Sequence, residues 1–226
     1  NTNAGTATVT IQGTGNFSGS VVEEFEIKPF DISGLEEEQI VLGTDNVYTG
    51  FEIKPSVEIT FNGSVVDNIN FEIVYSNNVN VEDDSTVTIK ALTNTNFSGE
   101  ISVGFSITPK DIAEADVTFA DATYSAAAIT PVPNVFLEDY GTLTQGTDYT
   151  ISHSEIVSAG PHDITVTGTG NYTGTVNAEF TVQQMSISGA VIENIEDIYY
   201  TGSGITPTPQ VTLEGFGSLE KDADYT

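Results

Sequence analysis

The chain has 226 residues, of which 33 are acidic and only five are lysine or arginine, so its formal net charge is −28 at pH 7. Such a charge repels phosphate backbones and anionic membrane surfaces, and the chain lacks the basic patches on which nucleic-acid binding depends. It contains no cysteine, which excludes disulfides, thiolate nucleophiles and sulfur-ligated zinc.

A seven-residue phrase that occurs three times is the clearest pattern in the chain. It is Gly-Thr-Gly-Asn-Phe-Ser-Gly at 13–19, Thr-Asn-Thr-Asn-Phe-Ser-Gly at 93–99 and Gly-Thr-Gly-Asn-Tyr-Thr-Gly at 168–174. Recurrence at a nearly constant interval is typical of an array of small modules. We therefore do not expect one enzyme-sized core.

Three other markers recur in the same order as the phrase. They are Phe25, Phe105 and Phe180, which open Phe-x-Ile/Val units; Tyr48, Tyr124 and Tyr200, which precede a proline by seven residues; and Phe71, Tyr149 and Tyr225, which close equivalent segments. Together the markers predict four parts. These are the C-terminal half of a β-repeat at 1–32, full repeats at 33–112 and 113–187, and the N-terminal half of a repeat at 188–226.

The segments around the phrase have the alternation of half-buried strands. In 6–11, threonines alternate with Ala7, Val9 and Ile11, which places the apolar side chains on one face. The segments 101–107 and 176–182 alternate in the same way. The phrase lies between two such strands, so we expect a hairpin loop whose Asn and Gly supply positive φ and whose aromatic residue covers the end of a small core. The sequence predicts an all-β fold.

In combination, these phrases resemble the tandem Ig-like repeats of large bacterial surface proteins, in particular the MBG/YDG-type module. The matching phrases are Tyr-Thr-Gly at 200–202, Gly-Thr-Asp-Tyr-Thr at 146–150 and the loop phrase at 168–174. The resemblance implies tandem small Ig-like β-sandwich modules, with 33–112 and 113–187 as full ones, arranged as an extended rod. It also implies a non-catalytic, extracellular role as the stalk or fibre of an adhesin or a secreted filament.

Catalysis is not expected from the residues either. The two histidines, His153 and His162, lie in one predicted repeat and have no counterpart in the others. No nucleophile-elbow sequence is present. Pairs of carboxylates occur throughout so acidic a chain, so they do not indicate glycosidase chemistry.

Calcium is the metal that the sequence favours, because hard cations take clustered oxygen atoms. The candidate ligands are Asp31 with Glu36, Asp111 with Asp116, and the run Glu82, Asp83 and Asp84. Asp31 and Asp111 occupy equivalent positions at predicted repeat boundaries. The third boundary has Ser186 instead, and no EF-hand or nonapeptide calcium motif is present, so a solvated acidic surface is the alternative. No other cofactor is expected.

The chain also contains four sequons for N-glycosylation, at Asn16, Asn62, Asn96 and Asn171. Three of them occupy the same position of the repeated phrase. The alternative is that a hairpin loop itself needs Asn, Ser and Thr at these positions.

The two predicted half-repeats indicate the partners. Either the polypeptide continues, or a neighbouring subunit completes each half-repeat by adding strands to a sheet edge. The expected partners are therefore adjacent copies of the same repeat or neighbouring subunits. No apolar run approaches the roughly 20 residues that span a bilayer, so this segment is not expected to insert into a membrane.

A second function remains open from the sequence. The repeated tyrosines Tyr48, Tyr124 and Tyr200 could bind a host or biofilm glycan or protein, which would make the chain an adhesion module. Repeated aromatic residues in small β-modules more commonly lie in the core.

Overall fold

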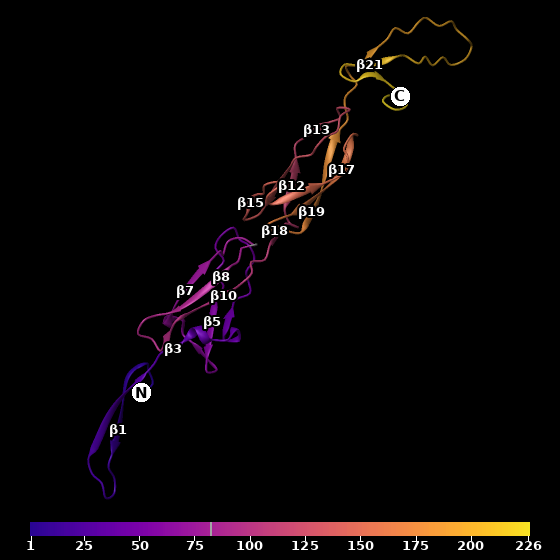
Figure 1. Cartoon of the computed structure of the whole chain (residues 1–226). Coiled ribbons are helices and arrows are strands. Elements are labelled where there is room, and N and C mark those ends of the chain that lie inside the picture. The colour runs from indigo at the N-terminus through magenta and orange to yellow at the C-terminus, as the bar shows by residue number, and fades with distance from the viewer. Residues whose placement is uncertain (82) are drawn as a thin grey trace. The chain divides into compact units, whose positions relative to one another are not determined.

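The computed structural model describes residues 1–81 and 83–226, and over these residues the chain is all-β, with short 3₁₀ turns as its helical elements (Figure 1). The chain divides into two structural units. Unit 1 comprises residues 1–111 and 168–173, and unit 2 comprises residues 112–167 and 174–226. The repeated loop at 168–173 therefore belongs to unit 1. The four-part division expected from the sequence markers stays a prediction.

Unit 1 is built of short strands connected by turns. Its strands are β1 (Gly5–Gln12), β2 (Ser20–Ile27), β3 (Phe30–Asp31), β4 (Ile40–Leu42), β5 (Val57–Phe61), β6 (Ser64–Val66), β7 (Phe71–Ser76), β8 (Thr86–Ala91), β9 (Phe97–Ser98), β10 (Glu100–Gly104), β11 (Lys110–Asp111) and β18 (Tyr172–Thr173). Its 3₁₀ helices are η1 (Ile32–Gly34), η2 (Glu37–Gln39) and η3 (Asn68–Asn70). Antiparallel pairing gives the sheets β4-β5-β6 and β10-β8-β7 and the hairpin β1-β2. The pairs β3-β9 and β11-β18 are parallel.

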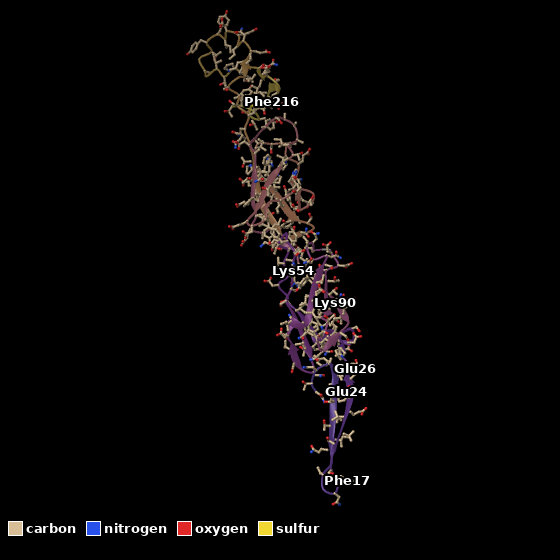
Figure 2. The ribbon with its side chains drawn as sticks, turned by 90° about the vertical axis from the view of Figure 1, so that its left-hand side faces the viewer. Phe17, Glu24, Glu26, Lys54, Lys90 and Phe216 are labelled. Carbon is tan, nitrogen blue, oxygen red and sulfur yellow. The ribbon has the colours of Figure 1, made fainter. Side chains whose placement is uncertain are left out.

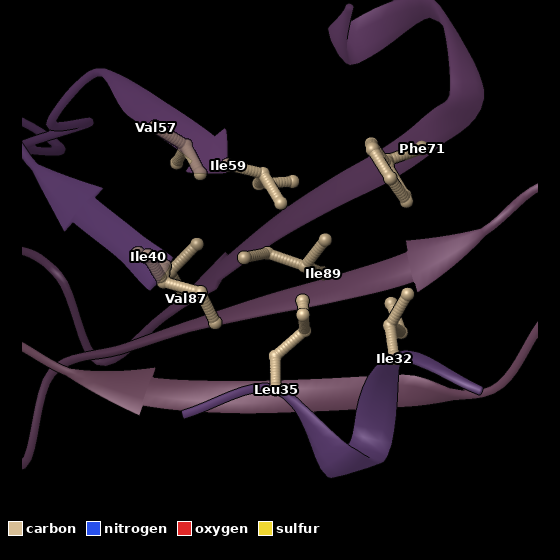
Figure 3. Packing of buried hydrophobic residues seen from close by; sticks show 8 residues of the cluster. All are labelled: Ile32, Leu35, Ile40, Val57, Ile59, Phe71, Val87 and Ile89. Atoms are coloured by element: carbon tan, nitrogen blue, oxygen red, sulfur yellow. The ribbon is translucent and has the colours of Figure 1, made fainter. Parts of the chain in front are cut away.

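The core of unit 1 lies between the two antiparallel sheets (Figure 3). In β8, Val87 and Ile89 are fully buried while the threonines on either side of Val87 face the other way. They pack with Val57 and Ile59 of β5 and with Phe71 of β7. Period-two alternation thus becomes burial on one face, which stabilises the unit by about 1.5–3 kcal/mol for each such side chain.

The hairpin β1-β2 is paired from Gly5 with Ile27 to Gln12 with Ser20. In the described part of the chain it has no third strand. Ala7 is buried, but the apolar side chains toward the tip stay uncovered: exposed fractions are 66% for Ile11 and Val21 and 79% for Phe17 (Figure 2). The predicted alternation of 6–11 forms a strand whose apolar face lacks a covering sheet.

Unit 2 is also built of short strands. Its strands are β12 (Asp116–Phe119), β13 (Ala122–Thr123), β14 (Pro133–Leu137), β15 (Gly141–Thr142), β16 (Tyr149–Ser152), β17 (Gly160–Gly168), β19 (Thr175–Gln183), β20 (Val191–Ile192), β21 (Val211–Leu213) and β22 (Gly217–Leu219). They form the sheets β12-β14-β15, β13-β19-β17-β16 and β20-β21-β22. A buried cluster contains Ile156, Ile164, Phe180 and Val182, with Phe119 and Tyr124 packed against it.

A hydrogen bond from a tyrosine hydroxyl to a proline carbonyl occurs in three places. Its donor and acceptor pairs are Tyr75 and Pro55 at 2.7 Å, Tyr149 and Pro133 at 3.2 Å, and Tyr225 and Pro209 at 3.0 Å. The sequence markers aligned Phe71 with Tyr149 and Tyr225. Since Phe71 has no hydroxyl, the donor in unit 1 is Tyr75 on the same strand.

Candidate functional site

The asparagine of the repeated phrase makes the same contacts in the loops 93–99 and 168–174. The Oδ1 of Asn96 accepts the backbone N–H of Ala4 at 2.7 Å, and its Nδ2 donates to Oδ1 of Asn3 at 3.2 Å. The Oδ1 of Asn171 accepts the N–H of Val81 at 2.9 Å, and its Nδ2 donates to Oδ1 of Asn80 at 3.1 Å. Each carboxamide thus binds an Asn-X dipeptide that lies far away in the sequence.

The backbone of the same loops adds a second attachment. The carbonyl of Asn96 accepts the N–H of Phe30 at 2.9 Å, and that of Asn171 accepts the N–H of Lys110 at 3.0 Å. From there the loop residues run parallel to a two-residue strand, in the pairs β3-β9 and β11-β18. We use the term loop contact for the side-chain bonds of the asparagine together with this parallel pairing.

The aromatic residue after the asparagine packs inward in both loop contacts. The ring of Phe97 lies 5.3 Å from that of Phe71 and 5.7 Å from that of Phe61, between centroids, and packs against the core of unit 1. Tyr172 is buried and meets Tyr48 edge-on, with centroids 5.5 Å apart. The expectation that the aromatic residue packs onto a small core is confirmed for Phe97. It is wrong for Phe17 in the first copy of the phrase, which is 79% exposed.

The backbone conformation explains why the last residue of the phrase is glycine. Gly19, Gly99 and Gly174 have φ values of 94°, 79° and 81°, a region that other L-residues rarely adopt. At Gly99 an added Cβ would also meet the carboxylate of Asp31. The positive φ of Gly99 therefore favours glycine, and a larger residue there would also displace the Asp31 side chain.

The copy of the phrase at 13–19 makes no such contact within the described residues. Its backbone closes on itself through a bond from Gly13 N–H to the Gly19 carbonyl at 2.9 Å. The side chains of Asn16 and Phe17 are exposed. This loop therefore presents the same groups to solvent that the other two copies bury or bond.

Unit 2 contains a cavity of about 350 Å³. Its lining includes Tyr124, whose ring stacks on Phe216 at 5.9 Å, and Met185. The segment 157–159 also lines it. Apolar and polar groups are mixed in this lining.

The calcium candidates are not brought together. Among the described residues, no group of three or more Asp, Glu or His side chains is placed to hold a metal ion. Asp31 instead caps η1, where its Oδ1 accepts the N–H of Ser33 at 3.0 Å, and this bond lowers the pKa of its carboxyl group. Asp83 accepts from the backbone and side-chain nitrogens of Asn80 at 3.2 Å.

The other calcium candidates lie in different elements. Glu36 precedes η2 and donates its N–H to Gln39, Asp111 ends β11, and Asp116 begins β12. Asp84 lies in the turn before β8, and Glu82 lies outside the described residues. Calcium binding stays a prediction.

The four sequons differ in their surroundings. Asn16 is exposed, and Asn62 lies at positive φ in the turn between β5 and β6. The Nδ2 atoms of Asn96 and Asn171, to which a glycan would be joined, already donate hydrogen bonds. Glycosylation stays a prediction at all four.

The repeated tyrosines are also in unlike surroundings. Tyr48 and Tyr124 are half-buried, whereas Tyr200 and its neighbour Tyr199 are 91% and 94% exposed. The histidines each bond to a nearby carbonyl, His153 to that of Ser154 and His162 to that of Ser158.

The sequence markers did not point to Asn3 and Asn80 as partners of the phrase. The signal for them is a second short repeat, Asn-Thr-Asn-Ala at 1–4 and Asn-Val-Asn-Val at 78–81.

In the described part of the chain, no helix has the length and hydropathy of a transmembrane span. Comparison with protein-family models, characterised proteins and solved structures gave no match to this chain.

Proposed function

We propose that this chain is a structural, non-catalytic segment of an extracellular surface protein, in which serial Ig-like β-sandwich repeats form a stalk or fibre. The observation that carries this proposal is the recurrence of the loop contact. Asn96 and Asn171 bind an Asn-X dipeptide with the same two atoms and nearly the same distances. When the same contact recurs between successive repeats, it can hold each repeat at the same angle to the next, as a serial structure needs.

The chemistry of the surface supports the same role. A net charge of −28 keeps separate molecules apart and soluble, and it gives no preference for a particular ligand. The polar groups of the loop contact are used in holding segments of the chain together. In this proposal the repeats are spacers, exported to the cell surface or into a secreted filament, and their partners are adjacent copies of the same repeat.

Small-angle scattering of the whole chain tests the proposal. We expect an extended particle, and we expect the double variant Asn96→Ala/Asn171→Ala to sample a broader range of maximum dimensions. Asn16→Ala is the matched control when all samples are measured at dilutions where the chain is monomeric, because within one chain this asparagine of the phrase makes no loop contact. A compact globule, or an effect of the control equal to that of the double variant, would contradict the proposal.

A second candidate function rests on the adjacent, exposed rings of Tyr199 and Tyr200. Exposed aromatic side chains can stack on sugar rings, so the chain would then be a glycan- or protein-binding adhesion module. Glycan-array binding that is lost in Tyr199→Ala/Tyr200→Ala, with the melting temperature unchanged, would favour this candidate over a spacer. An array without signal would remove it for glycans.

A further inference from the structure

The residues that receive the loop contact have counterparts in unit 2, and backbone hydrogen bonds identify them. Tyr48 N–H donates to the Thr108 carbonyl at 2.8 Å, just as Tyr124 N–H donates to that of Gln183 at 2.9 Å. The two-residue strand β11 begins two positions after Thr108. Its counterpart in unit 2 is therefore 185–186, Met185 and Ser186.

A second pair of bonds fixes the other receiving segment. Ile53 N–H donates to the Asn78 carbonyl at 2.7 Å, and Ile129 N–H donates to that of Ile156 at 2.9 Å. The dipeptide Asn80–Val81 lies two and three positions after Asn78. The corresponding dipeptide in unit 2 is 158–159, Ser158 and Ala159.

These counterparts surround the cavity of unit 2. Ser158, Ala159 and Met185 all line it, together with Tyr124. Tyr124 is the counterpart of Tyr48, whose ring meets that of Tyr172 in the loop contact. The cavity is therefore placed where a loop of the phrase would lie, and its volume of about 350 Å³ leaves room for an aromatic side chain.

The chain offers an unused loop of the matching kind at 13–19. Phe17 is 79% exposed, and Asn16 is exposed beside it. The strands that carry this loop have an uncovered apolar face, on which Ile11 and Val21 are 66% exposed. A partner that receives the loop would also cover that face.

The sheet β20-β21-β22 also has apolar side chains that no other sheet covers in the described part of the chain. Val191 and Ile192 of β20 are 64% and 60% exposed. In unit 1 the sheet β4-β5-β6 covers its apolar side chains with β10-β8-β7, the sheet that contains the strands flanking the loop 93–99. The hairpin β1-β2 flanks the loop 13–19 in the same way.

We propose that the cavity of unit 2 binds the loop 13–19 of a second copy of this chain, in a head-to-tail contact. In it, Asn16 Oδ1 accepts the N–H of Ala159 and Asn16 Nδ2 donates to the Ser158 hydroxyl. Phe17 enters the cavity beside Tyr124. The hairpin β1-β2 of the second copy then covers β20-β21-β22. This inference deepens the proposed function and rests on it, because it names the partner of the serial repeats.

A head-to-tail contact has different surfaces on its two sides, so it continues from copy to copy unless one side is blocked. We expect the chain to form dimers and longer oligomers as its concentration rises. The repulsion between two chains of charge −28 is screened by salt, so the association is measured at moderately high ionic strength.

Sedimentation velocity over a wide range of concentration tests the proposal. Asn16→Ala is expected to raise the dissociation constant about fivefold to tenfold, as loss of hydrogen bonds of ordinary strength predicts. Phe17→Ala is expected to raise it further. Phe51→Ala is the matched control, because Phe51 is 77% exposed and lies outside both surfaces.

On the receiving side, Met185→Glu places a charge in the cavity and is expected to abolish association. Its control is Val132→Glu, at a residue that is 71% exposed and does not line the cavity. Circular dichroism and the melting temperature establish that each variant is folded.

Mixing the two kinds of variant gives the sharpest result. Phe17→Ala keeps the cavity and Met185→Glu keeps the loop, so the mixture is expected to form a dimer that does not grow. A chain that stays monomeric at every concentration, or one whose association is indifferent to Phe17→Ala and Met185→Glu, overturns the head-to-tail contact. Scattering from the monomer still tests the proposed function separately.

Discussion

The side-chain Oδ1 of Asn171 accepts the backbone N–H of Val81 at 2.9 Å, although 90 positions separate the two residues. The bond provides an acceptor for a main-chain donor at the end of the segment 78–81. A partly buried N–H without a hydrogen-bond partner destabilises the folded state. Asn171 therefore stabilises the fold by giving the Val81 N–H an acceptor, as well as through its other hydrogen bond.

Asn171→Ala should expose this N–H. We expect faster hydrogen exchange at the Val81 amide and a loss of about 1 kcal/mol in the free energy of unfolding. Two-dimensional NMR of exchange at single amides measures the first effect. Asn171→Asp is the matched variant, because it keeps the acceptor for Val81 and loses the donor to Asn80. Unchanged exchange at Val81 in the alanine variant would show that the side-chain bond does not hold this segment.

The tyrosine–proline bonds predict an alkaline limit to stability. Burial raises the pKa of Tyr75 and of Tyr149 above the ordinary value of 10.0, so the folded chain favours the neutral phenol. Their contribution is complete below pH 10.0 and is lost as the pH rises through the raised pKa of the folded state.

Urea unfolding at several pH values checks this expectation. The free energy of unfolding should fall with pH above 10.0, and Tyr75→Phe and Tyr149→Phe should each reduce that fall. Tyr199→Phe, at an exposed position, controls for the loss of a hydroxyl. A pH dependence that is the same in Tyr75→Phe as in the unmodified chain would contradict the prediction.

The core of unit 1 predicts a steep cost of truncation. Ile89 has no exposed surface, so Ile89→Ala should lower the free energy of unfolding by about 2–5 kcal/mol through lost burial and the cavity left behind. Ile69→Ala is the control, since Ile69 is 76% exposed and its truncation should change stability by less than about 0.5 kcal/mol. Denaturant unfolding of the two variants side by side decides the matter; equal effects would mean that Ile89 is not in a packed core.

The four sequons should differ in how often they are glycosylated. In a glycosylating host we expect modification at the exposed Asn16 and at Asn62, and little at Asn96 and Asn171, because a glycan on Nδ2 would break a bond of the loop contact. Mass spectrometry of glycopeptides measures the occupancy of each site. High occupancy at Asn171 together with a protected Val81 amide would be incompatible with the geometry described for that loop.

The strands could be predicted because their signal is local. Alternation in 176–182 indicates which side chains face the core, and the phrase at 168–174 marks a loop by its Asn and Gly alone. These patterns depend on neighbours one or two positions away. For the same reason the all-β fold follows from the sequence.

The loop contact could not be predicted in this way, because its two sides lie about ninety positions apart and no period connects them. The segments 1–4 and 78–81 share Asn-x-Asn followed by Ala or Val, but in unit 2 the corresponding residues at 156–159 are Ile-Val-Ser-Ala. Because the Asn-x-Asn pattern is present in two of these three segments and absent from the third, it is a weak signal of the contact. Likewise, the acidic candidates share short stretches of sequence, and sequence proximity does not say whether two carboxylates face each other.

The groups that bond in the asparagine part of the loop contact are all uncharged: carboxamides, amide hydrogens and carbonyl oxygens. Their strength depends little on ionic strength, whereas the repulsion from a charge of −28 is screened as salt rises. Salt therefore controls how closely separate molecules approach one another and leaves the attachment of each loop unchanged. A chain built in this way can pack closely with its neighbours at high ionic strength or stay apart from them at low ionic strength, with its internal connections the same in both.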